Sequence, residues 1–295
     1  MERIAVVLDL HFGKKCNIRL DDTDTVITEK LMQLLDKNIT KIIFAGDIFE
    51  NCSITRKTFM STVKLFSLFK EKGIELYTIY GNHDEYRYNK SFRKETPLND
   101  LVDLKLITLL SNNILSTDNY DIYGFDYLDI DELKNFISTV HEKDKKIICI
   151  GHTFYNNELM GGNNNLTEDL IKEGNIDYLV LGHDHSEYKE VKNNNTIIYR
   201  IGSVLRDSSS KNNLERVPGY LLFEEGKPKF IKFECKNLNE LLIAKVTVKN
   251  KQEIDFSSLI EEIKIVTKEN DADDIIDAIN KLKNSDVKEI IRRNL

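Results

Sequence analysis

Residues 4–11 read Ile-Ala-Val-Val-Leu-Asp-Leu-His, an apolar run that ends in a carboxylate and an imidazole. Runs of this length rich in β-branched residues are typical of buried strands. Similar runs, each ending at a Gly, Asp or His, recur at 41–45, 76–80, 147–150 and 178–181. Helical patterns with one apolar face, at 26–38 and 54–72, separate the first three runs. This alternation predicts an α/β fold with a largely parallel sheet covered by helices.

The second half of the chain shows a different pattern, in which short strands follow one another. We expect these strands at 187–191, 196–201, 219–223 and 229–234. We interpret them as a second, more antiparallel sheet. A boundary follows near 236–240, after which helical patterns return at 273–283 and 287–293. We therefore expect a main domain over residues 1–238 and a small C-terminal α+β lobe over residues 239–295.

The composition is that of an ordinary folded protein, with 41% hydrophobic residues in a chain of 295. A net charge of −7 disfavours a chain that is basic all over and coats nucleic acid, although a local basic channel is compatible with it. The four cysteines are far apart without a C-x-x-C pair, so we expect reduced thiols rather than a structural zinc site. The N-terminal segment has no basic leader and no apolar run of membrane-spanning length, so we expect a cytoplasmic protein with no membrane partner.

Polar side chains cluster where the five apolar strands of the first half end. The clusters read Asp9-Leu10-His11, Gly46-Asp47, Gly81-Asn82-His83-Asp84, Gly151-His152 and Gly182-His183-Asp184-His185. A lone Asp or His after a strand is usually a turn or capping residue, but five of the six histidines of this chain fall in these clusters. Ligands bind outside the carboxyl ends of strands in open α/β sheets, so we expect the clusters to converge on one crevice.

The residue types in these clusters favour a metal site. In a D-x-H or H-x-H step of extended backbone, the first and third side chains point the same way and can reach one ion cluster. Carboxylate, imidazole and amide oxygen suit Mn²⁺, Fe²⁺ or Zn²⁺ better than Ca²⁺, and we expect Mn²⁺. Two such ions can clamp the attacking and leaving oxygens of a displacement and generate hydroxide near neutral pH. The expected ligands are Asp9, His11, Asp47, Asn82, His152, His183 and His185.

In this order, the motifs DLH, GD, GNHD, GH and GHDH resemble the five signature blocks of the calcineurin-like metallophosphoesterase superfamily. The resemblance covers residues 1 to about 235 and implies a four-layer α/β/β/α sandwich. The implied ligands of one ion are Asp9, His11 and His185. Those of the other ion are Asn82, His152 and His183, with Asp47 bridging both. His83 would contact the phosphate and help protonate the leaving group, and Asp84 would orient its ring.

Two segments bear on the substrate. Residues 198–206 and 216–220 are similar to the segment after the last motif in SbcD-like DNA repair nucleases, especially phage versions. This similarity implies Ser203 and Arg206 as substrate contacts, although an arginine there can simply cap a loop. The segment 85–94 interleaves basic and aromatic residues, which suits phosphate pairing and base stacking on single strands. Its candidate contacts are Arg87, Lys90, Arg93 and Lys94, and the alternative is a surface loop with partly buried tyrosines.

We therefore expect an SbcD-like DNA exonuclease or endonuclease that cleaves phosphodiester bonds. The superfamily also contains cyclic-nucleotide phosphodiesterases and phosphatases, so a small-molecule phosphodiesterase or phosphatase is the alternative. A metal-binding scaffold without catalysis is disfavoured because His83 and Asp84 are both present. Besides DNA, the candidate partners are a second copy of the chain and an SMC-like ATPase. The apolar helical face of residues 275–282 could dock that ATPase, or could pack within the chain.

Overall fold

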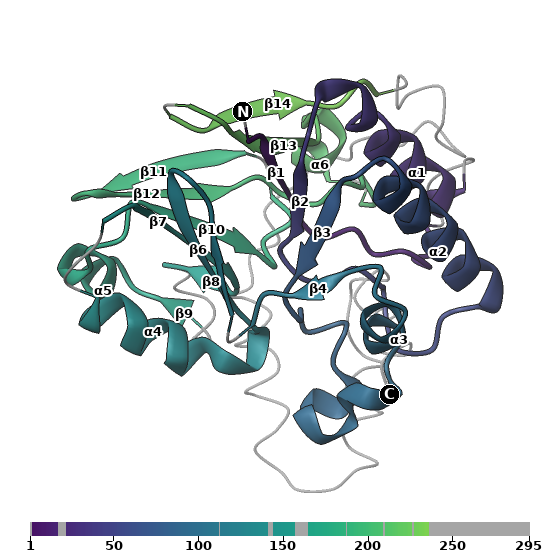
Figure 1. Ribbon diagram of the computed structural model, residues 1–295, viewed down its shortest axis with the longest axis horizontal. Coiled ribbons are helices and arrows are strands. Elements are labelled where there is room, and N and C mark those ends of the chain that lie inside the picture. The colour runs from purple at the N-terminus through teal and green to yellow at the C-terminus, as the bar shows by residue number, and fades with distance from the viewer. Residues whose placement is uncertain are drawn as a thin grey trace, which may run out of the picture. The chain divides into compact units, whose positions relative to one another are not determined.

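The computed structural model describes residues 2–16, 22–111, 113–140, 144–156, 165–186, 188–208, 210–225 and 227–235. All of them belong to one compact unit, which runs from Met1 to Val246 (Figure 1). A second unit, Thr247–Leu295, lies outside the described residues, and so does the predicted domain boundary at residue 238. The C-terminal lobe and its elements therefore stay predictions. In the part of the chain that is described, no helix has the length and apolar character that would let it span a membrane.

A six-stranded sheet is built around the N-terminal strand, in the order β14-β13-β1-β2-β3-β4. Its strands are β1 (Ile4–Val7), β2 (Lys41–Phe44), β3 (Glu75–Thr78), β4 (Thr108–Leu109), β13 (Gly219–Phe223) and β14 (Lys229–Lys232). Strands β1 to β4 are parallel; the sequence predicts this for β1, β2 and β3 but does not predict β4, and β13 and β14 add an antiparallel pair at one edge. The carboxyl ends of β1, β2 and β3 therefore lie at the same edge of the sheet.

The second six-stranded sheet has the order β11-β12-β10-β7-β6-β5. Its strands are β5 (Ile114–Ser116), β6 (Tyr120–Phe125), β7 (Lys146–His152), β10 (Tyr178–Gly182), β11 (Lys189–Asn193) and β12 (Thr196–Arg200). The four central strands are parallel, and only β5 and β11 are antiparallel to their neighbours. The expectation that the late strands form a sheet of their own is wrong. Strands β11 and β12 extend this sheet, whereas β13 and β14 return to the first, because apolar patterning indicates a strand but not its partner.

Helices and short turns connect these strands. The α-helices are α1 (Thr23–Met32), α2 (Arg56–Glu71), α3 (Pro97–Asp103), α4 (Ile130–Thr139), α5 (Glu168–Glu173) and α6 (Lys211–Glu215). The 3₁₀ turns are η1 (Leu35–Lys37), η2 (Tyr86–Tyr88), η3 (Lys90–Glu95) and η4 (Tyr127–Asp129), and β8 (Phe154–Tyr155) pairs with β9 (Asn165–Leu166). Five α-helices begin with a side-chain cap on a backbone N–H, which satisfies a donor that the helix leaves free; the caps are Asp22, Thr55, Thr96, Thr167 and Ser210.

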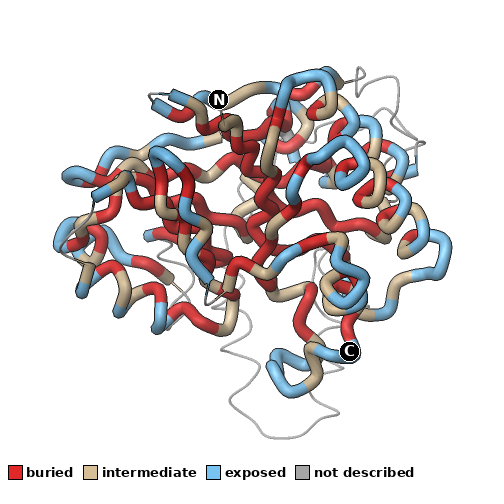
Figure 2. Tube along the Cα trace, in the orientation of Figure 1, coloured by how far each residue is buried: buried red, intermediate tan, exposed pale blue. Residues whose placement is uncertain are grey.

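Three apolar clusters separate the layers of the described unit. Ile4 and Val6 of β1 face Ile150 and Val180 of the second sheet, so one cluster lies between the sheets. Alternate side chains of each strand point outward instead, where α1, α2 and α3 cover the first sheet, and α4 and α5 cover the second. Figure 2 shows the buried residues along the strands and the exposed ones on the outer sides of the helices. This arrangement confirms the predicted α/β/β/α order.

Candidate metal and catalytic site

Loops at the carboxyl ends of five strands bring the seven predicted metal residues together. Donor atoms of Asp9, His11, Asp47 and His185 all lie within 4.8 Å of one another. The same is true of donor atoms of Asp47, His152 and His183. Asp47 is common to both groups, and Asn82 joins the second group through its amide oxygen, 3.0 Å from His152 Nε2. The two groups are formed by residues from both sheets.

The first group combines residues that follow β1, β2 and β10. His11 Nε2 lies 3.0 Å from Nε2 of His185 and 3.6 Å from Asp47 Oδ2. The carboxylate of Asp9 is fully buried and accepts the backbone N–H of His183 at 3.0 Å. Two ring nitrogens that converge beside two carboxylates are the donor set of a borderline divalent cation.

The second group is ordered by a backbone contact. His152 Nδ1 lies 2.7 Å from the carbonyl oxygen of Ala45, so it donates its N–H there and directs Nε2 toward the site. His152 Nε2 lies 3.3 Å from Asp47 Oδ2. Burial alone would lower the pKa of His152, but the charge of Asp47 outweighs it and raises the pKa to about 9. The surroundings of Asp47 therefore favour positive charge.

His183 and His185 have the opposite tendency. Burial, aided by the nearby His152, lowers the pKa of His183 to about 4. Burial also lowers the pKa of His185. Both rings are therefore neutral at pH 7, which is the form of imidazole that binds a metal ion.

The contacts of the Asp47 carboxylate show whether the two groups fit metal ions. Its Oδ1 accepts the backbone N–H of His83 at 2.9 Å. Its Oδ2 is buried and has no hydrogen-bond partner in the described part of the chain, yet it lies between the Nε2 atoms of His11 and His152. Burial alone would raise the pKa of Asp47, but the charges of these rings hold it well below its usual range. A buried carboxylate oxygen without a partner is costly, so the arrangement fits a cation on either side of Asp47.

The backbone of these loops is not the extended chain that the D-x-H and H-x-H argument assumed. Asp9, His11, Asp47 and His183 have φ values of 48°, 55°, 51° and 86°. Such left-handed conformations are uncommon for residues other than glycine, and they occur most often at functional sites. The side chains converge because each loop turns sharply after its strand, not because a strand continues.

Two of the glycines before the polar residues are required by close packing. A Cβ atom at Gly46, which has a φ of 84°, would lie 2.6 Å from His152 Nδ1. A Cβ atom at Gly81 would overlap the side chain of Asp47. Because glycine has no Cβ atom, it permits these loops to approach one another closely.

His83 lies beside the first group, with its ring centroid 4.8 Å from that of His11. Its Nδ1 lies 2.5 Å from the carbonyl oxygen of Glu50 and donates to it. The buried carboxylate of Asp84 instead accepts the backbone N–H groups of Phe49 and Gly81, at 3.2 and 3.1 Å. The expectation that Asp84 orients the ring of His83 is therefore wrong, because Asp84 ties together the loops after β2 and β3.

Glu50 is a site residue that sequence reasoning missed. Its Oε2 lies 2.9 Å from His11 Nδ1 and 3.2 Å from the ammonium of Lys14. Burial would raise the pKa of Glu50, but the contacts with His11 and Lys14 lower it to about 2. Glu50 thus stays charged and holds the proton of His11 on Nδ1, which leaves Nε2 free to bind a cation. Its position three residues after Asp47, in the same loop, was the available signal.

Aromatic rings line the side of the second group. The ring of Phe154 lies 4.3 Å from that of His183, and the ring of Tyr127 lies 5.5 Å from it. Tyr88, which is 64% exposed, lies 6.2 Å from Tyr127. No sequence signal pointed to Tyr127 or Phe154, because the strand β6 that precedes Tyr127 was not predicted.

The predicted substrate segment divides into two kinds of residue. Arg93 forms ion pairs with the buried carboxylates of Glu85 and Asp126, and its guanidinium lies 4.1 Å from the ring centroid of Tyr80. Lys90 pairs with Asp129. Arg93 therefore stabilises the fold rather than facing a substrate, and Lys90 is only partly available. Arg87 and Lys94 are exposed.

Ser203 and Arg206 are also unsuited to the role predicted for them. The hydroxyl of Ser203 is buried, donates to the carbonyl of Leu205 at 2.8 Å and accepts from Arg216 at 3.0 Å. Arg206 is 8% exposed and donates to the carbonyl of Leu214 at 3.4 Å. The alternative that this segment simply caps a loop fits these contacts, because both polar groups bind backbone carbonyls.

Comparison with curated proteins identifies relatives that are repair proteins. The DNA double-strand break repair protein Mre11 of Saccharolobus solfataricus is 24% identical over 259 residues, which are 84% of this chain and 65% of that protein. The DNA double-strand break repair protein Mre11 of Sulfurisphaera tokodaii is 27% identical over 238 residues, which are 76% of this chain and 58% of that protein. The chain thus spans about three fifths of the length of these relatives.

A solved structure supports the fold. A dimetal phosphatase from Danio rerio superposes with a TM-score of 0.53 at 8% identity, over 79% of this chain and 99% of that one. The family model described as calcineurin-like phosphoesterase matches residues 2–187, a range that includes every motif of the candidate site. The chain therefore belongs to the calcineurin-like phosphoesterase family, which confirms the predicted class of enzyme, a hydrolase that acts on phosphoester bonds.

Proposed function

We propose that the protein is a dinuclear metal-dependent nuclease that hydrolyses phosphodiester bonds of DNA. The observation that carries the dinuclear assignment is the buried Oδ2 of Asp47, which lies between Nε2 atoms of the two donor groups. Because both groups meet at one carboxylate, two ions held there would lie close enough to act on one phosphate.

The two ions would have separate ligands around Asp47. The first would be held by Asp9, His11 and His185, and the second by Asn82, His152 and His183. Bound ions would supply Lewis-acid activation of the phosphoryl group and a nucleophile at neutral pH. Nitrogen and oxygen donors without thiolate are compatible with Mn²⁺, and also with Fe²⁺ or Zn²⁺.

His83 is positioned to act on the substrate rather than on an ion. Its Nδ1 proton is held by the carbonyl of Glu50, so its Nε2 is the atom left to contact the phosphate or the leaving oxygen. A positioned imidazole of this kind contributes about 10²- to 10⁴-fold to a reaction rate. Asp84 supports it indirectly, because its hydrogen bonds to Phe49 and Gly81 fix the two loops that carry Asp47 and His83.

DNA is the preferred substrate for two reasons. The curated relatives that cover most of this chain are named as DNA double-strand break repair proteins. In addition, the exposed ring of Tyr88 continues the aromatic side of the second group through Tyr127, and exposed aromatic rings stack on unpaired bases. The alternative, a small-molecule phosphodiesterase or phosphatase, is favoured by the internal ion pairs of Lys90 and Arg93, which reduce the positive charge available for DNA.

The remaining partners are part of the same proposal. An SMC-like ATPase and a second copy of the chain are the candidate protein partners. The segment expected to dock the ATPase lies outside the described residues. A cytoplasmic location would bring the enzyme to DNA in a cell without a nucleus.

The deciding experiment compares DNA with a small substrate. The purified chain, supplied with Mn²⁺, is expected to degrade labelled single- or double-stranded DNA and to hydrolyse bis(p-nitrophenyl) phosphate. His83→Ala is the control, since it should keep both ions and lose about 10²- to 10⁴-fold in turnover on either substrate. Hydrolysis of the small diester with no action on DNA would support the alternative. DNA degradation that survives in the His83→Ala protein would point to a contaminating nuclease.

A further inference from the structure

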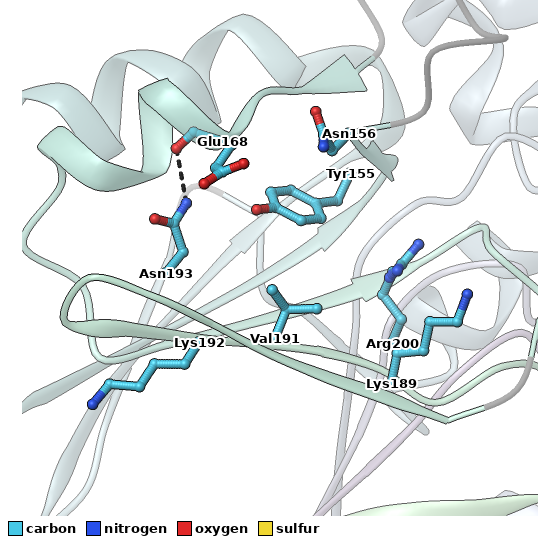
Figure 3. Close-up of a pocket in the computed structure, with 8 residues that line it drawn as sticks. All are labelled: Tyr155, Asn156, Glu168, Lys189, Val191, Lys192, Asn193 and Arg200. Carbon is cyan, nitrogen blue, oxygen red and sulfur yellow. Dashed lines mark hydrogen bonds between the residues drawn. The ribbon is translucent and has the colours of Figure 1, made fainter.

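A hollow outside the candidate metal site lies at the β11 edge of the second sheet. It has a volume of about 570 Å³, and its walls are the β11–β12 pair on one side and β8 with the start of α5 on the other. Its lining includes Tyr155, Glu168, Lys189, Asn193 and Arg200 (Figure 3). No sequence motif pointed to this hollow, because its residues come from strand interiors and edges rather than from strand-end clusters.

Two of the three cationic residues that line the hollow face each other across neighbouring strands. Lys189 of β11 pairs in register with Arg200 of β12, and Figure 3 shows both side chains extending to the same side of the strand pair. Like charges directly opposite each other destabilise a sheet. Nη1 of Arg200 contacts Asp184 at 2.8 Å, but its Nε is buried without a hydrogen-bond partner in the described part of the chain. Lys189 is exposed and forms no ion pair with any described residue.

The negative charge that the described residues place near the hollow does not neutralise both Lys189 and Arg200. Asp184 offers one carboxylate to Arg200. Among the described residues that line the hollow, Glu168 is the only carboxylate, and Lys172 already pairs with it at 2.9 Å. Lys192 is at the margin, and Figure 3 shows its side chain extending away from the other residues. The described residues therefore leave a net positive charge in the hollow, with the buried Nε of Arg200 unpaired and the ammonium of Lys189 exposed.

Two contacts connect the hollow to the metal site. Asp184, the partner of Arg200, lies between His183 and His185 in the loop after β10. On the opposite wall, Tyr155 directly follows Phe154, whose ring lies 4.3 Å from that of His183. Asp184 and the Phe154-Tyr155 step are thus the two connections along which a strand bound at the metal site would reach the hollow.

We propose that this hollow is a phosphate subsite, in which Lys189 and Arg200 bind a backbone phosphate of the nucleic acid strand next to the scissile one. The proposal rests on the proposed function. A phosphodiester carries one negative charge and two free oxygens, which match one ammonium and one guanidinium N–H. The bound phosphate also relieves the repulsion between the two opposed cations. Because this phosphate is not the scissile one, the hollow selects a substrate that has more than one phosphate.

The test compares two lysines of the same strand. Binding of a labelled ten-nucleotide single strand is measured over a series of salt concentrations in the His83→Ala background, which blocks turnover. For Lys189→Ala, we expect the slope of log affinity against log salt concentration to become shallower by about 0.7, as for the loss of one phosphate contact. The affinity at 0.1 M salt should fall about fivefold. Lys192→Ala is the matched control and should bind as the parent does, because its side chain points away from the hollow.

A second measurement separates the subsite from the metal site. With His83 intact, Lys189→Ala should hydrolyse bis(p-nitrophenyl) phosphate at the parent rate, because that substrate has no second phosphate to place in the hollow. Equal binding by the Lys189→Ala and Lys192→Ala proteins would overturn the proposal. A matching loss on the small diester would overturn it too, since Lys189 would then act through Asp184 on the metal site. A parent protein that hydrolyses the small diester but binds no DNA would reject the proposed function, and the subsite with it.

Discussion

The loops after the strands and the segment 85–94 both concentrate polar side chains, but the two regions use them differently. In the loops, Asp47 and the facing histidines are buried close together, and an oxygen of Asp47 has no hydrogen-bond partner among the described residues. In the segment, Arg93 and Lys90 are neutralised by carboxylates of the protein itself. Unpartnered buried polar atoms destabilise a fold unless a ligand binds them, whereas paired charges hold a turn in place.

The largest expected effect is at Asp47. Asp47→Ala should remove the carboxylate shared by both donor groups, so the protein should lose both ions, and hydrolysis should fall by about 10³-fold or more because Lewis-acid stabilisation of several kcal/mol is lost. Elemental analysis of the purified variant measures the ions per chain, and Asp100→Ala, at an exposed position of α3, is the control. Retention of two ions in the Asp47→Ala protein would contradict the shared role.

In the segment 85–94, Arg93 is expected to affect stability rather than metal binding. Arg93→Ala should leave the buried carboxylates of Glu85 and Asp126 without their partner and lower the free energy of unfolding by about 3 kcal/mol. Urea denaturation measures this loss. Lys94→Ala, the exposed neighbour, should stay within about 0.5 kcal/mol of the parent. If the Arg93→Ala protein keeps the parental stability but binds DNA poorly, Arg93 contacts the substrate instead.

The same contrast explains which features the sequence predicts. The strand-end clusters combine a residue type with a fixed place in the fold, since the carboxyl ends of parallel strands share an edge, and the seven expected residues do meet there. The basic residues of 85–94 carried no such information, because one of the two carboxylates that pair with Arg93, Asp126, follows a strand far along the chain. Tyr127 and the hollow beside β11 depend on strand pairings that one sequence does not reveal. The left-handed backbone at Asp9 and His11 was equally inaccessible, because residues other than glycine give no local signal for it.

Glu50 should have an intermediate effect, because it contacts a predicted ligand of the first ion only. Glu50→Ala should weaken binding of that ion by about 10- to 100-fold, as His11 loses the group that fixes its proton on Nδ1. Glu50→Gln keeps an oxygen acceptor and should recover part of the affinity. A metal titration monitored by calorimetry should show weaker metal binding at one site and unchanged binding at the other. Equal weakening of both sites would mean that Glu50 supports the whole loop rather than His11.

The smallest effect concerns the part of the segment that the protein leaves free. Arg87 and Lys94 are exposed, and neither has an ion pair in the described part of the chain. If DNA passes over this segment, replacing both residues with alanine in the His83→Ala background should weaken single-strand binding. The slope of log affinity against log salt concentration should become shallower by about 1.4, because each lost phosphate contact removes about 0.7. Replacement of Lys57 and Lys64, two exposed lysines of α2, removes the same charge from the outer layer and should change binding much less.

Because Arg93 and Lys90 already hold the turn through their ion pairs, the variant without Arg87 and Lys94 should keep its stability and its activity on a small diester. Unchanged binding would leave the segment with a structural role alone, whereas an equal loss in both double variants would indicate a nonspecific effect of net charge.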